Sequence, residues 1–450
     1  MSNVKFKVQP GGKLFGRIRV PGDKSISHRS IMLGSLAEGT TKITGFLEGE
    51  DSLATLKAFQ EMGVEIDGPV NGNITIQGVG LKGLKKPNKP LDMGNSGTAM
   101  RLMSGILAGQ SFSAELIGDA SLSKRPMKRV TDPLAEMGAK IKTTQGGMPP
   151  LQTMENTSLK AIDYIMPMAS AQVKSCVLFA GLFAEGTTTV IEPAPTRDHT
   201  EKMLNGFGYQ VISEKLDSMR TKVSVTGGGK LTAGDIDVPS DISSATFFLV
   251  AASIAEEADL VIEHVGINPT RTGIIDILTL MGADISLENQ SEVGGEPVAD
   301  IRVRSAKLKG INIPKELVPL AIDEFPVLFV AASAATGQTV LTGAEELRVK
   351  ESDRIQVMAD ALNAIGIDAV PTEDGMVING GKQQKQSSII LSHHDHRISM
   401  AMAVAGLTAN SEIVIDDCAN VNTSFPTFVS LINEIGMTIN VEQPEDKNNG

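Results

Sequence analysis

The sequence is poor in cysteine, short of positive charge and without a hydrophobic run of membrane-spanning length. Its two cysteines, Cys176 and Cys418, lie among apolar residues without paired spacing, which argues against a disulfide framework or a zinc site and for reduced thiols. No apolar run reaches the roughly 18–20 residues of a membrane span. Residues 4–8 alternate like a strand and do not resemble a signal peptide. We therefore expect a soluble, cytoplasmic protein without a membrane partner.

The charge balance and the length set two further limits. A formal net charge of -12 argues against a general nucleic-acid surface, so any anion site must be a local concentration of Lys and Arg. At 450 residues with 41% hydrophobic content, the chain exceeds one ordinary core, and two or three well-packed domains are expected.

A glycine-centred motif recurs along the whole chain. Each copy ends an amphipathic helical pattern and leads into a strand, which is the role of a C-terminal capping glycine. Successive glycines lie 75, 70, 74, 84 and 70 positions apart, at Gly63, Gly138, Gly208, Gly282, Gly366 and Gly436. Six copies in register indicate six related units.

A second pattern recurs in step with the first. It consists of a polar start, a mostly apolar helix, a loop and a strand, at residues 27–45, 98–118, 170–192, 243–263, 323–343 and 395–416. A helix that is apolar all round is expected to be buried on every side. We predict two α/β domains of three units each, with short sheets wrapped around buried helices.

The polar starts of the buried helices are expected to gather at one end of each domain. Ser25 or Ser27 is predicted to cap the first of these helices, which also carries Lys24 and Arg29 near its start. The other five starts hold residues 95–98, 170–172, 241–244, 323–324 and 395–397. Ordinary capping explains Ser, Thr, Asp and Asn at these places, but cations are disfavoured beside a positive helix end. An anionic ligand would remove that conflict.

Several motifs leave alternatives open. Arg125 lies in a Pro-containing turn and Arg197 in a loop, and each is either solvated or directed at a ligand. Lys350 and Arg354 lie four apart, which by itself favours a surface ion-pair helix with Glu351 beside them. Residues 22–25 lack the spacing of a P-loop. Residues 393–396 have no regular ligand set and an adjacent arginine, so we expect no metal site.

Four motifs together, at residues 21–29, 94–101, 124–127 and 395–397, closely resemble the 5-enolpyruvylshikimate-3-phosphate synthases of the enolpyruvyl transferase family. The likeness covers essentially the whole chain. It implies two α/β domains, each of three βαβαββ repeats with buried parallel helices, an inside-out α/β barrel. One domain would comprise residues 1–22 plus 240–450 and the other residues 23–239, and the two would close over ligand.

The resemblance also implies a reaction. The enolpyruvyl group of phosphoenolpyruvate would pass to the 5-hydroxyl of shikimate 3-phosphate and release phosphate, in the penultimate step towards chorismate. No cofactor is needed, and we expect a monomer. Both substrates are anionic, which would account for clustered cations in an acidic protein.

The residues that match the family's site are carried over from the resemblance alone. Catalysis would involve Asp323 as base and Glu351 as acid, with Lys24 as a competitor for the acid's role. Shikimate 3-phosphate would be bound by Lys24, Ser25, Arg29, Ser170, Ala171, Gln172, Arg197, Asp323 and Lys350. Phosphoenolpyruvate would be bound by Lys24, Gly97, Arg125, Gln172, Arg354 and Arg397.

The sequence departs from one branch of this family and fits the second. Thr423 or Ser424 stands where that branch has a lysine reaching phosphoenolpyruvate, and Ala171 stands where it has serine. Gly97 lacks a methyl group that crowds the pocket in some members, so we expect that glyphosate can enter.

Two other functions remain as rivals. A transferase acting on UDP-N-acetylglucosamine would carry a reactive cysteine in residues 118–124, and none is present. A non-catalytic anion-binding repeat protein would need the cations but would tolerate loss of Asp323 and Glu351.

Overall fold

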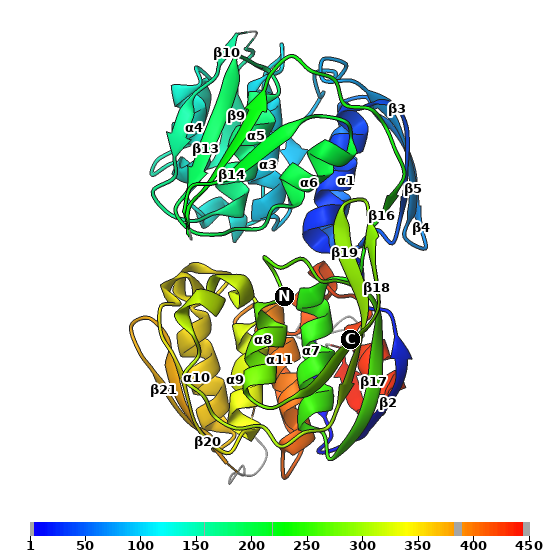
Figure 1. The fold of residues 1–450 in the computed structure, drawn as a ribbon, viewed down its shortest axis with the longest axis vertical. Helices are drawn as coiled ribbons and strands as arrows, with labels where there is room; N and C mark the ends of the chain where they lie inside the picture. Colours follow the sequence, from blue (N-terminus) through cyan, green and yellow to red (C-terminus); the bar gives the residue numbers. More distant parts are fainter. Residues whose placement is uncertain (1–3, 157, 218, 382–388, 444–450) are drawn as a thin grey trace, which may run out of the picture. The chain divides into compact units, whose positions relative to one another are not determined.

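The computed structural model describes residues 4–156, 158–217, 219–381 and 389–443. The chain forms two compact units: unit 1 comprises Met1–Pro21, Pro239–Ser291 and Pro297–Gly450, and unit 2 comprises Gly22–Val238 and Glu292–Glu296 (Figure 1). The chain passes between units one residue before each expected crossover, and the short segment 292–296 groups with unit 2.

Unit 2 contains three four-stranded sheets, in the orders β16-β3-β5-β4, β6-β7-β9-β8 and β11-β13-β15-β14, and a β10-β12 pair. In each four-stranded sheet the first two strands are parallel and the remaining neighbours antiparallel. The strands are β3 (Glu38–Thr44), β4 (Glu65–Val70), β5 (Asn73–Val79), β6 (Leu91–Asp92), β7 (Ala114–Ile117), β8 (Ile141–Thr144), β9 (Met148–Thr153), β10 (Leu159–Lys160), β11 (Asp163–Ile165), β12 (Ala184–Glu185), β13 (Thr187–Glu192), β14 (Val211–Lys215), β15 (Thr221–Thr226) and β16 (Ile236–Asp237). The helices are α1 (Lys24–Leu36), α2 (Glu50–Glu61), α3 (Gly97–Ala108), α4 (Lys128–Glu136), α5 (Ala171–Gly181) and α6 (His199–Gly206).

Unit 1 contains the four-stranded sheets β18-β19-β17-β2 and β23-β24-β1-β25 and the three-stranded sheet β20-β22-β21, in which both neighbouring pairs are antiparallel. Two of its strands come from the start of the chain: β2 pairs in parallel with β17, and β1 lies between β24 and β25. The strands are β1 (Lys5–Val8), β2 (Lys13–Ile18), β17 (Glu257–Gly266), β18 (Asp284–Val293), β19 (Glu296–Arg304), β20 (Gly337–Leu341), β21 (Asp368–Pro371), β22 (Met376–Gly380), β23 (Ile389–Leu391), β24 (Ile413–Asp416) and β25 (Ile439–Glu442). The helices are α7 (Ile242–Ile254), α8 (Gly273–Leu280), α9 (Phe325–Ala334), α10 (Arg354–Ala364), α11 (His396–Ala405) and α12 (Phe428–Glu434).

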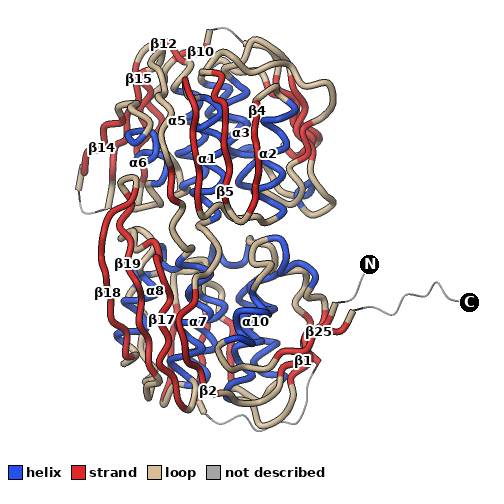
Figure 2. Tube along the Cα trace, turned by 90° about the vertical axis from the view of Figure 1, so that its right-hand side faces the viewer, coloured by secondary structure: helices blue, strands red, loops and turns tan. Residues whose placement is uncertain are grey.

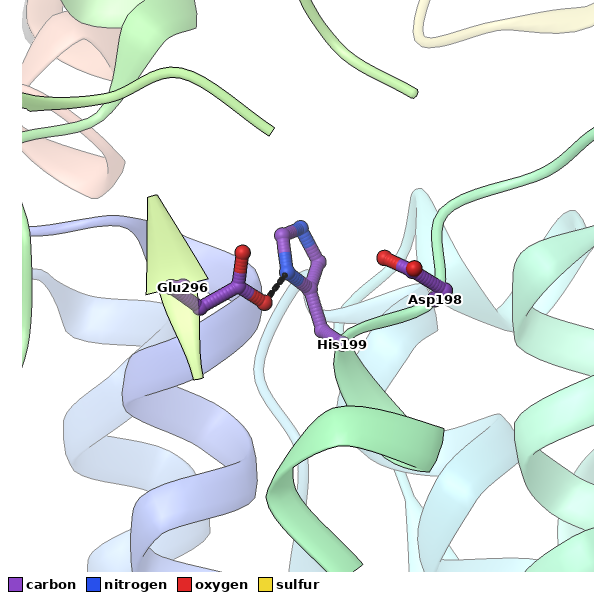
Figure 3. Close-up of side chains that lie close together, drawn as sticks. All are labelled: Asp198, His199 and Glu296. Atoms are coloured by element: carbon purple, nitrogen blue, oxygen red, sulfur yellow. Dashed lines mark hydrogen bonds and ion pairs between the residues drawn. The ribbon is translucent and has the colours of Figure 1, made fainter. Parts of the chain in front are cut away.

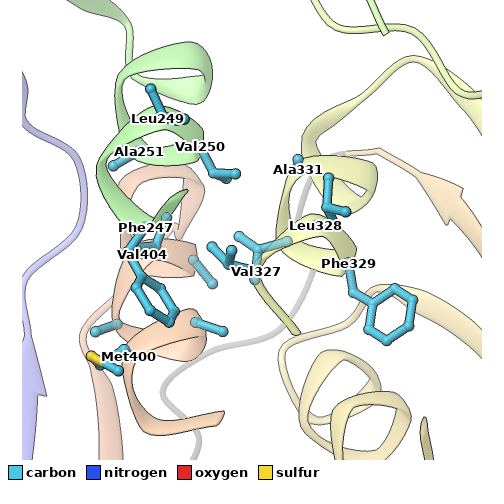
Figure 4. Packing of buried hydrophobic residues seen from close by; sticks show 14 of the residues in the cluster. Phe247, Leu249, Val250, Ala251, Val327, Leu328, Phe329, Ala331, Met400 and Val404 are labelled. Atoms are coloured by element: carbon cyan, nitrogen blue, oxygen red, sulfur yellow. The ribbon is translucent and has the colours of Figure 1, made fainter. Parts of the chain in front are cut away.

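The expected α/β fold is confirmed. In each unit the sheets lie outside a group of helices, as the trace shows (Figure 2). In unit 1, α7, α9 and α11 pack against one another through side chains such as Val250, Val327 and Val404 (Figure 4). Nearly every residue of α7 is buried, because the helix has apolar neighbours on all sides. Phe248 packs against the rings of Phe425 and Phe428, and truncating a core aromatic of this kind costs roughly 3–5 kcal/mol.

The six motif glycines all end helices in the left-handed region of backbone space. Their φ angles are 84, 92, 75, 91, 92 and 117°, at Gly63, Gly138, Gly208, Gly282, Gly366 and Gly436. A side chain would be strained at each of these angles, so the repeated glycine is the residue that allows each second helix to turn into a strand.

Gly22 has a different role, at the junction before α1. A Cβ atom there would lie 1.9 Å from the carbonyl oxygen of Gly45, so the two backbones meet more closely than any other residue allows. This contact fixes the start of α1 against the loop after β3.

The two cysteines are both buried and unpaired. Burial raises the pKa of Cys418 to about 12 and raises that of Cys176 further, which keeps both thiols protonated and unreactive. Within the described part of the chain, none of the helices combines the length and apolar character that a bilayer crossing requires.

Candidate active site

The start of α1 in unit 2 differs from the expected capping. Asp23 is the N-cap, and its carboxylate accepts a hydrogen bond from Ile26 N at 2.8 Å. The predicted caps, Ser25 and Ser27, are wrong, because the helix begins at Lys24 and the buried hydroxyl of Ser27 accepts from Leu47 N instead. The carboxylate places a full negative charge beside the positive end of the helix, and it is a strong hydrogen-bond acceptor for the unpaired N–H groups there.

Lys24 lies in the first turn and forms an ion pair with Asp51, a buried residue of α2. The expected conflict between Lys24 and the helix end is therefore relieved partly by a protein carboxylate. The Lys24 side chain keeps 29% of its surface exposed, so it stays accessible to a second anionic partner.

Arg29 is buried one turn further along α1. Its Nε donates to Thr200 Oγ1 at 2.6 Å, its Nη2 donates to Ser175 Oγ at 2.8 Å and its Nη1 donates to the carbonyl of Ser25 at 2.9 Å. Burial lowers the pKa of Arg29 to about 10, and the nearby charge of Arg197 acts in the same direction. The guanidinium remains charged at neutral pH and joins α1 to α5 and α6.

The starts of α3 and α5 are joined through Gln172. Its Nε2 donates to Thr98 Oγ1 at 2.9 Å, and its Oε1 accepts from Arg101 Nη1 at 2.5 Å. Ser170 caps α5 by accepting from Val173 N, and Ala171 is the first helical residue. The expected gathering of helix starts is thus present in unit 2.

Arg125 follows the short 3₁₀ turn Leu122–Lys124 and points to the start of α3. Its Nη2 donates to Asn95 Oδ1 at 2.8 Å and more weakly to Ser121 Oγ at 3.3 Å. A Cβ atom at Gly97 would lie 3.1 Å from Arg101 Nη1 and 3.5 Å from Arg125 Nη1. Glycine therefore leaves room beside two guanidinium groups.

His28 lies buried behind the start of α1, with Nδ1 2.7 Å from Thr55 Oγ1 and Nε2 3.4 Å from Ser96 Oγ. Burial lowers the pKa of His28 from 6.5 to about 3, with smaller contributions from neighbouring charges. The ring is neutral at physiological pH and links α1, α2 and the cap of α3.

This neutral histidine predicts a pH dependence of stability. The unfolded state takes up a proton near pH 6.5 and the folded state only near pH 3, so the free energy of unfolding falls as pH drops through that interval. The slope for one group is about 1.4 kcal/mol per pH unit. In urea titrations followed by circular dichroism between pH 6 and 4, His28→Asn is expected to lose this slope. His393→Asn, at an exposed position, is the control, and equal slopes in all three proteins would contradict the prediction.

Arg197 lies in the loop between β13 and α6, beside a cluster of Asp198, His199 and Glu296 (Figure 3). The ligand atoms of this cluster lie within 4.8 Å of one another, and His199 Nδ1 is 2.8 Å from Glu296 Oε1. Lys202 Nζ lies 3.4 Å from Asp198 Oδ1 and 3.6 Å from Glu296 Oε2. One ammonium group thus contacts both carboxylates, and His199 contacts Glu296, so we interpret the cluster as an ion-pair network.

Unit 1 holds a second group of predicted residues, around Asp323. Lys350 Nζ lies 3.3 Å and Arg354 Nη1 3.5 Å from Asp323 Oδ1. Lys350 also contacts Glu346 at 2.6 Å. Burial by itself disfavours the charge of Lys350, but the two carboxylates outweigh it and raise its pKa above the ordinary value. Lys350 is therefore a fixed cation.

The surface ion-pair helix considered for this segment is wrong. Lys350 and Glu351 precede α10, which begins at Arg354 after an Asp353 cap, so no helical face carries Lys350. The Arg354 side chain is only 1% exposed, and its Nε donates to the fully buried Asp395 at 2.8 Å. Its Nη2 donates to Glu351 Oε2 at 2.7 Å. Arg354 thus orients the predicted acid and contacts the predicted base.

The starts of the three buried helices of unit 1 meet at the same place. Arg397, near the start of α11, donates through Nη1 to the carbonyl of Asp323 at 2.9 Å and lies 4.0 Å from Glu324. Glu324 in turn accepts a hydrogen bond from Ser243 of α7. Thr423 donates its hydroxyl to the carbonyl of Asn420, so this hydroxyl is used inside its own 3₁₀ turn.

Sequence reasoning missed the partners of the predicted residues. Asp51 and Asp395 have the appearance of ordinary helix-start carboxylates, and only their burial identifies them as the partners of Lys24 and Arg354. Arg101 lies one helical turn after Gly97, within the motif at residues 94–101. The four-residue spacing was the one signal that could have placed it beside Gly97.

Comparison with known proteins identifies the family of the chain. The family model described as EPSP synthase (3-phosphoshikimate 1-carboxyvinyltransferase) matches residues 8–432. A 3-phosphoshikimate 1-carboxyvinyltransferase of Hydrogenovibrio crunogenus is 77% identical over 438 residues, covering 97% of this chain and 98% of that protein. One from Methylococcus capsulatus is 61% identical, covering 98% and 99%.

Solved structures give the same result. The EPSP synthase of Acinetobacter baumannii has a TM-score of 0.88 at 58% identity, covering 98% of this chain and 100% of that one. The enolpyruvyl transferase NikO of Streptomyces tendae, at 15% identity and a TM-score of 0.79, shares the fold. The chain therefore belongs to the EPSP synthase family, the 3-phosphoshikimate 1-carboxyvinyltransferases of the shikimate pathway.

Proposed function

We propose that the chain transfers the enolpyruvyl group of phosphoenolpyruvate to the 5-hydroxyl of shikimate 3-phosphate and that its two units divide the work. Unit 2 would supply most of the cations that hold shikimate 3-phosphate, and unit 1 the acid and the base. The observation that carries the proposal is the meeting of Asp323, Glu351 and Arg354 in a member of this family. Such a group suits proton transfer and would be superfluous for anion binding alone.

Shikimate 3-phosphate would be held at the helix starts of unit 2. Lys24, Ser25 and Arg29 at α1, Ser170, Ala171 and Gln172 at α5, and Arg197 in the loop before α6 are the proposed contacts. Helix starts offer backbone N–H groups and partial positive charge, which favour a phosphate. Asp323 and Lys350 would reach the ring from unit 1.

Phosphoenolpyruvate would bind to both units. Lys24, Gly97, Arg125 and Gln172 are its proposed contacts in unit 2, and Arg354 and Arg397 those in unit 1. Planar guanidinium groups match carboxylate and phosphate oxygens with paired hydrogen bonds. The ion pairs of Arg354 with Asp395 and Glu351 fix the plane of its guanidinium, and phosphoenolpyruvate would have to displace one of these carboxylates, because the Arg354 side chain is only 1% exposed.

The reaction would proceed by addition and elimination. Asp323 accepts the proton of the 5-hydroxyl while that oxygen bonds to the central carbon of phosphoenolpyruvate, and Glu351 gives a proton to the methylene carbon. In the second step a methyl proton returns to Glu351, the double bond re-forms and the carbon–oxygen bond to phosphate breaks, while Asp323 gives the proton of the former hydroxyl to the departing phosphate. The cations of both units stabilise the charge of the departing phosphate.

A phosphate-release assay tests this function. Purified protein with phosphoenolpyruvate and shikimate 3-phosphate should release phosphate and form the enolpyruvyl product detected by mass spectrometry. UDP-N-acetylglucosamine as alternative acceptor should give no product, and turnover with it alone would reverse the assignment of the acceptor.

We also propose that the two compact units act as the family's two domains, that the protein works as a monomer and that its compartment is the cytoplasm. The buried, protonated thiols of Cys176 and Cys418 support a reducing compartment.

Glyphosate sensitivity is expected from the space beside Gly97. A methyl group at this position would crowd Arg101 Nη1 at 3.1 Å and touch Arg125 Nη1 at 3.5 Å, so Gly97→Ala should weaken glyphosate inhibition by roughly tenfold or more and raise the KM for phosphoenolpyruvate less. Inhibition constants of glyphosate, measured in competition with phosphoenolpyruvate, check this prediction. Gly105→Ala is unsuitable as a control, because its Cβ atom would clash with the backbone of Cys176. The exposed Gly234 has open space, and Gly234→Ala should leave inhibition unchanged. Millimolar tolerance in the unaltered enzyme would contradict the expectation.

A further inference from the structure

A buried three-residue ion cluster lies behind the loop that carries Arg197. Lys174 of α5 is only 1% exposed, and its Nζ lies 3.0 Å from Glu192 Oε2 and 2.7 Å from Glu201 Oε1. Glu192 ends β13 and Glu201 lies in the first turn of α6, so the two carboxylates bracket the loop at residues 193–198.

The cluster is also tied to the loop itself. Thr196, the residue before Arg197, donates its hydroxyl to Glu192 Oε2 at 2.6 Å. The loop contains Pro193 and Pro195, which restrict its backbone further. Glu192 Oε2 contacts both Lys174 of α5 and Thr196 of the loop. This shared contact therefore fixes the residue before Arg197 relative to helix α5.

On its other side the cluster adjoins the partners of Arg29. Ser175 follows Lys174 and Thr200 precedes Glu201, and these two hydroxyls lie 2.7 Å apart while both accept from Arg29. The same helix starts therefore hold both arginines proposed to bind shikimate 3-phosphate.

Stability alone does not account for such a cluster. Replacing buried ion pairs with packed apolar side chains is often neutral or stabilising, because desolvation of the charges is costly. Here burial raises the pKa of Glu192, while Glu201 and Glu192 overcome the burial of Lys174 and raise its pKa. Lys174 therefore keeps its charge in the interior, and what the cluster determines is the geometry of the residues around it.

We propose that Lys174, Glu192 and Thr196 are positioning residues that hold Arg197, together with Arg29, in the arrangement that binds the phosphate of shikimate 3-phosphate. None of them needs to touch the substrate. The inference rests on the proposed function, since it assumes that Arg197 contacts that phosphate.

The decisive variant is Thr196→Val, which keeps the shape of the side chain and removes the hydroxyl. It should raise the KM for shikimate 3-phosphate about tenfold, with kcat and the KM for phosphoenolpyruvate within about twofold of the unaltered enzyme, because the hydrogen bond lost is one to a charged group. Thr187→Val, at an exposed threonine of strand β13, which leads into this loop, is the matched control and should change neither constant.

A second pair of variants tests the buried cation. Lys174→Met should raise the same KM and Lys174→Arg should restore most of it, since only a cation can hold both carboxylates. If Lys174→Met fails to fold, Thr196→Val and Glu192→Gln still decide the question. Equal KM changes for both substrates, or no change in Thr196→Val, would overturn the proposal.

Arg197→Ala separates this inference from the function on which it rests. Activity of the unaltered enzyme with shikimate 3-phosphate establishes the function. A rise in the KM for shikimate 3-phosphate in Arg197→Ala then shows that Arg197, the residue that the Lys174 cluster would position, binds this substrate. An unchanged KM would refute the positioning role and would leave the proposed function intact.

Discussion

Asp323→Asn and Glu351→Gln should each lower kcat by about 10²–10⁴-fold, the range typical of an acid or base. Each amide keeps the shape of its carboxylate but cannot exchange a proton. Asp323 lies 3.3 Å from Lys350 and 3.5 Å from Arg354, and Glu351 lies 2.7 Å from Arg354, so Arg354 orients both groups. Steady-state phosphate release measures the loss.

The control for this pair is Glu346→Gln. Glu346 contacts Lys350 at 2.6 Å, and Asp323 contacts the same lysine at 3.3 Å. The side chain of Glu346, however, is 51% exposed. Glu346→Gln should change kcat by less than about threefold, because an exposed ion pair contributes little.

Calorimetric titration should give nearly unchanged affinity for shikimate 3-phosphate in Glu351→Gln. Full turnover in both Asp323→Asn and Glu351→Gln would refute the enzyme assignment and favour an anion-binding protein.

Lys24→Met should lower kcat/KM by about 10²–10⁴-fold, with substrate binding and turnover both impaired. Lys24 is proposed to contact both substrates, and two hydrogen bonds to charged groups are worth roughly 1.5–3 kcal/mol each. Binding constants for each substrate and single-turnover rates separate the two effects.

Lys24→Met also leaves the buried carboxylate of Asp51 without this ion pair, so a second variant is needed. Lys24→Met combined with Asp51→Asn removes both charges and should restore stability but not activity. Lys89→Met is the matched control in the same unit, since Lys89 is 65% exposed and pairs with Glu61. Recovery of activity in the double variant would mean that Lys24 acts only through Asp51.

The repeat was predictable because it follows from local rules. A glycine at the end of an amphipathic helix is required wherever the backbone takes a positive φ, and Gly63 and Gly282 do so at 84 and 91°. A helix such as α7, with hardly a polar residue, can be stable only with neighbours on all sides. Which strands complete each sheet was not predictable, because β1 and β2 pair with segments hundreds of residues away.

The candidate site was predictable in its residue types but not in its pairings. Helix-start motifs pointed to Lys24, Arg29 and Arg397 through their charge beside a positive helix end. The position of the caps was misjudged, since Asp23 takes the place expected of Ser25 or Ser27. Lys350 was misplaced as well, because the spacing of charges does not reveal that α10 begins only at Arg354.

By itself the sequence determined the six-unit organisation, the burial of the apolar helices and the residues that carry charge at the helix starts, because these depend on periodicity and backbone sterics within short segments. The tertiary structure alone decided which carboxylate meets which cation: Asp51 with Lys24, Asp395 with Arg354, and Glu192 and Glu201 with Lys174. Such pairings join different helices and strands, and a buried charge takes the partner that packing brings within reach.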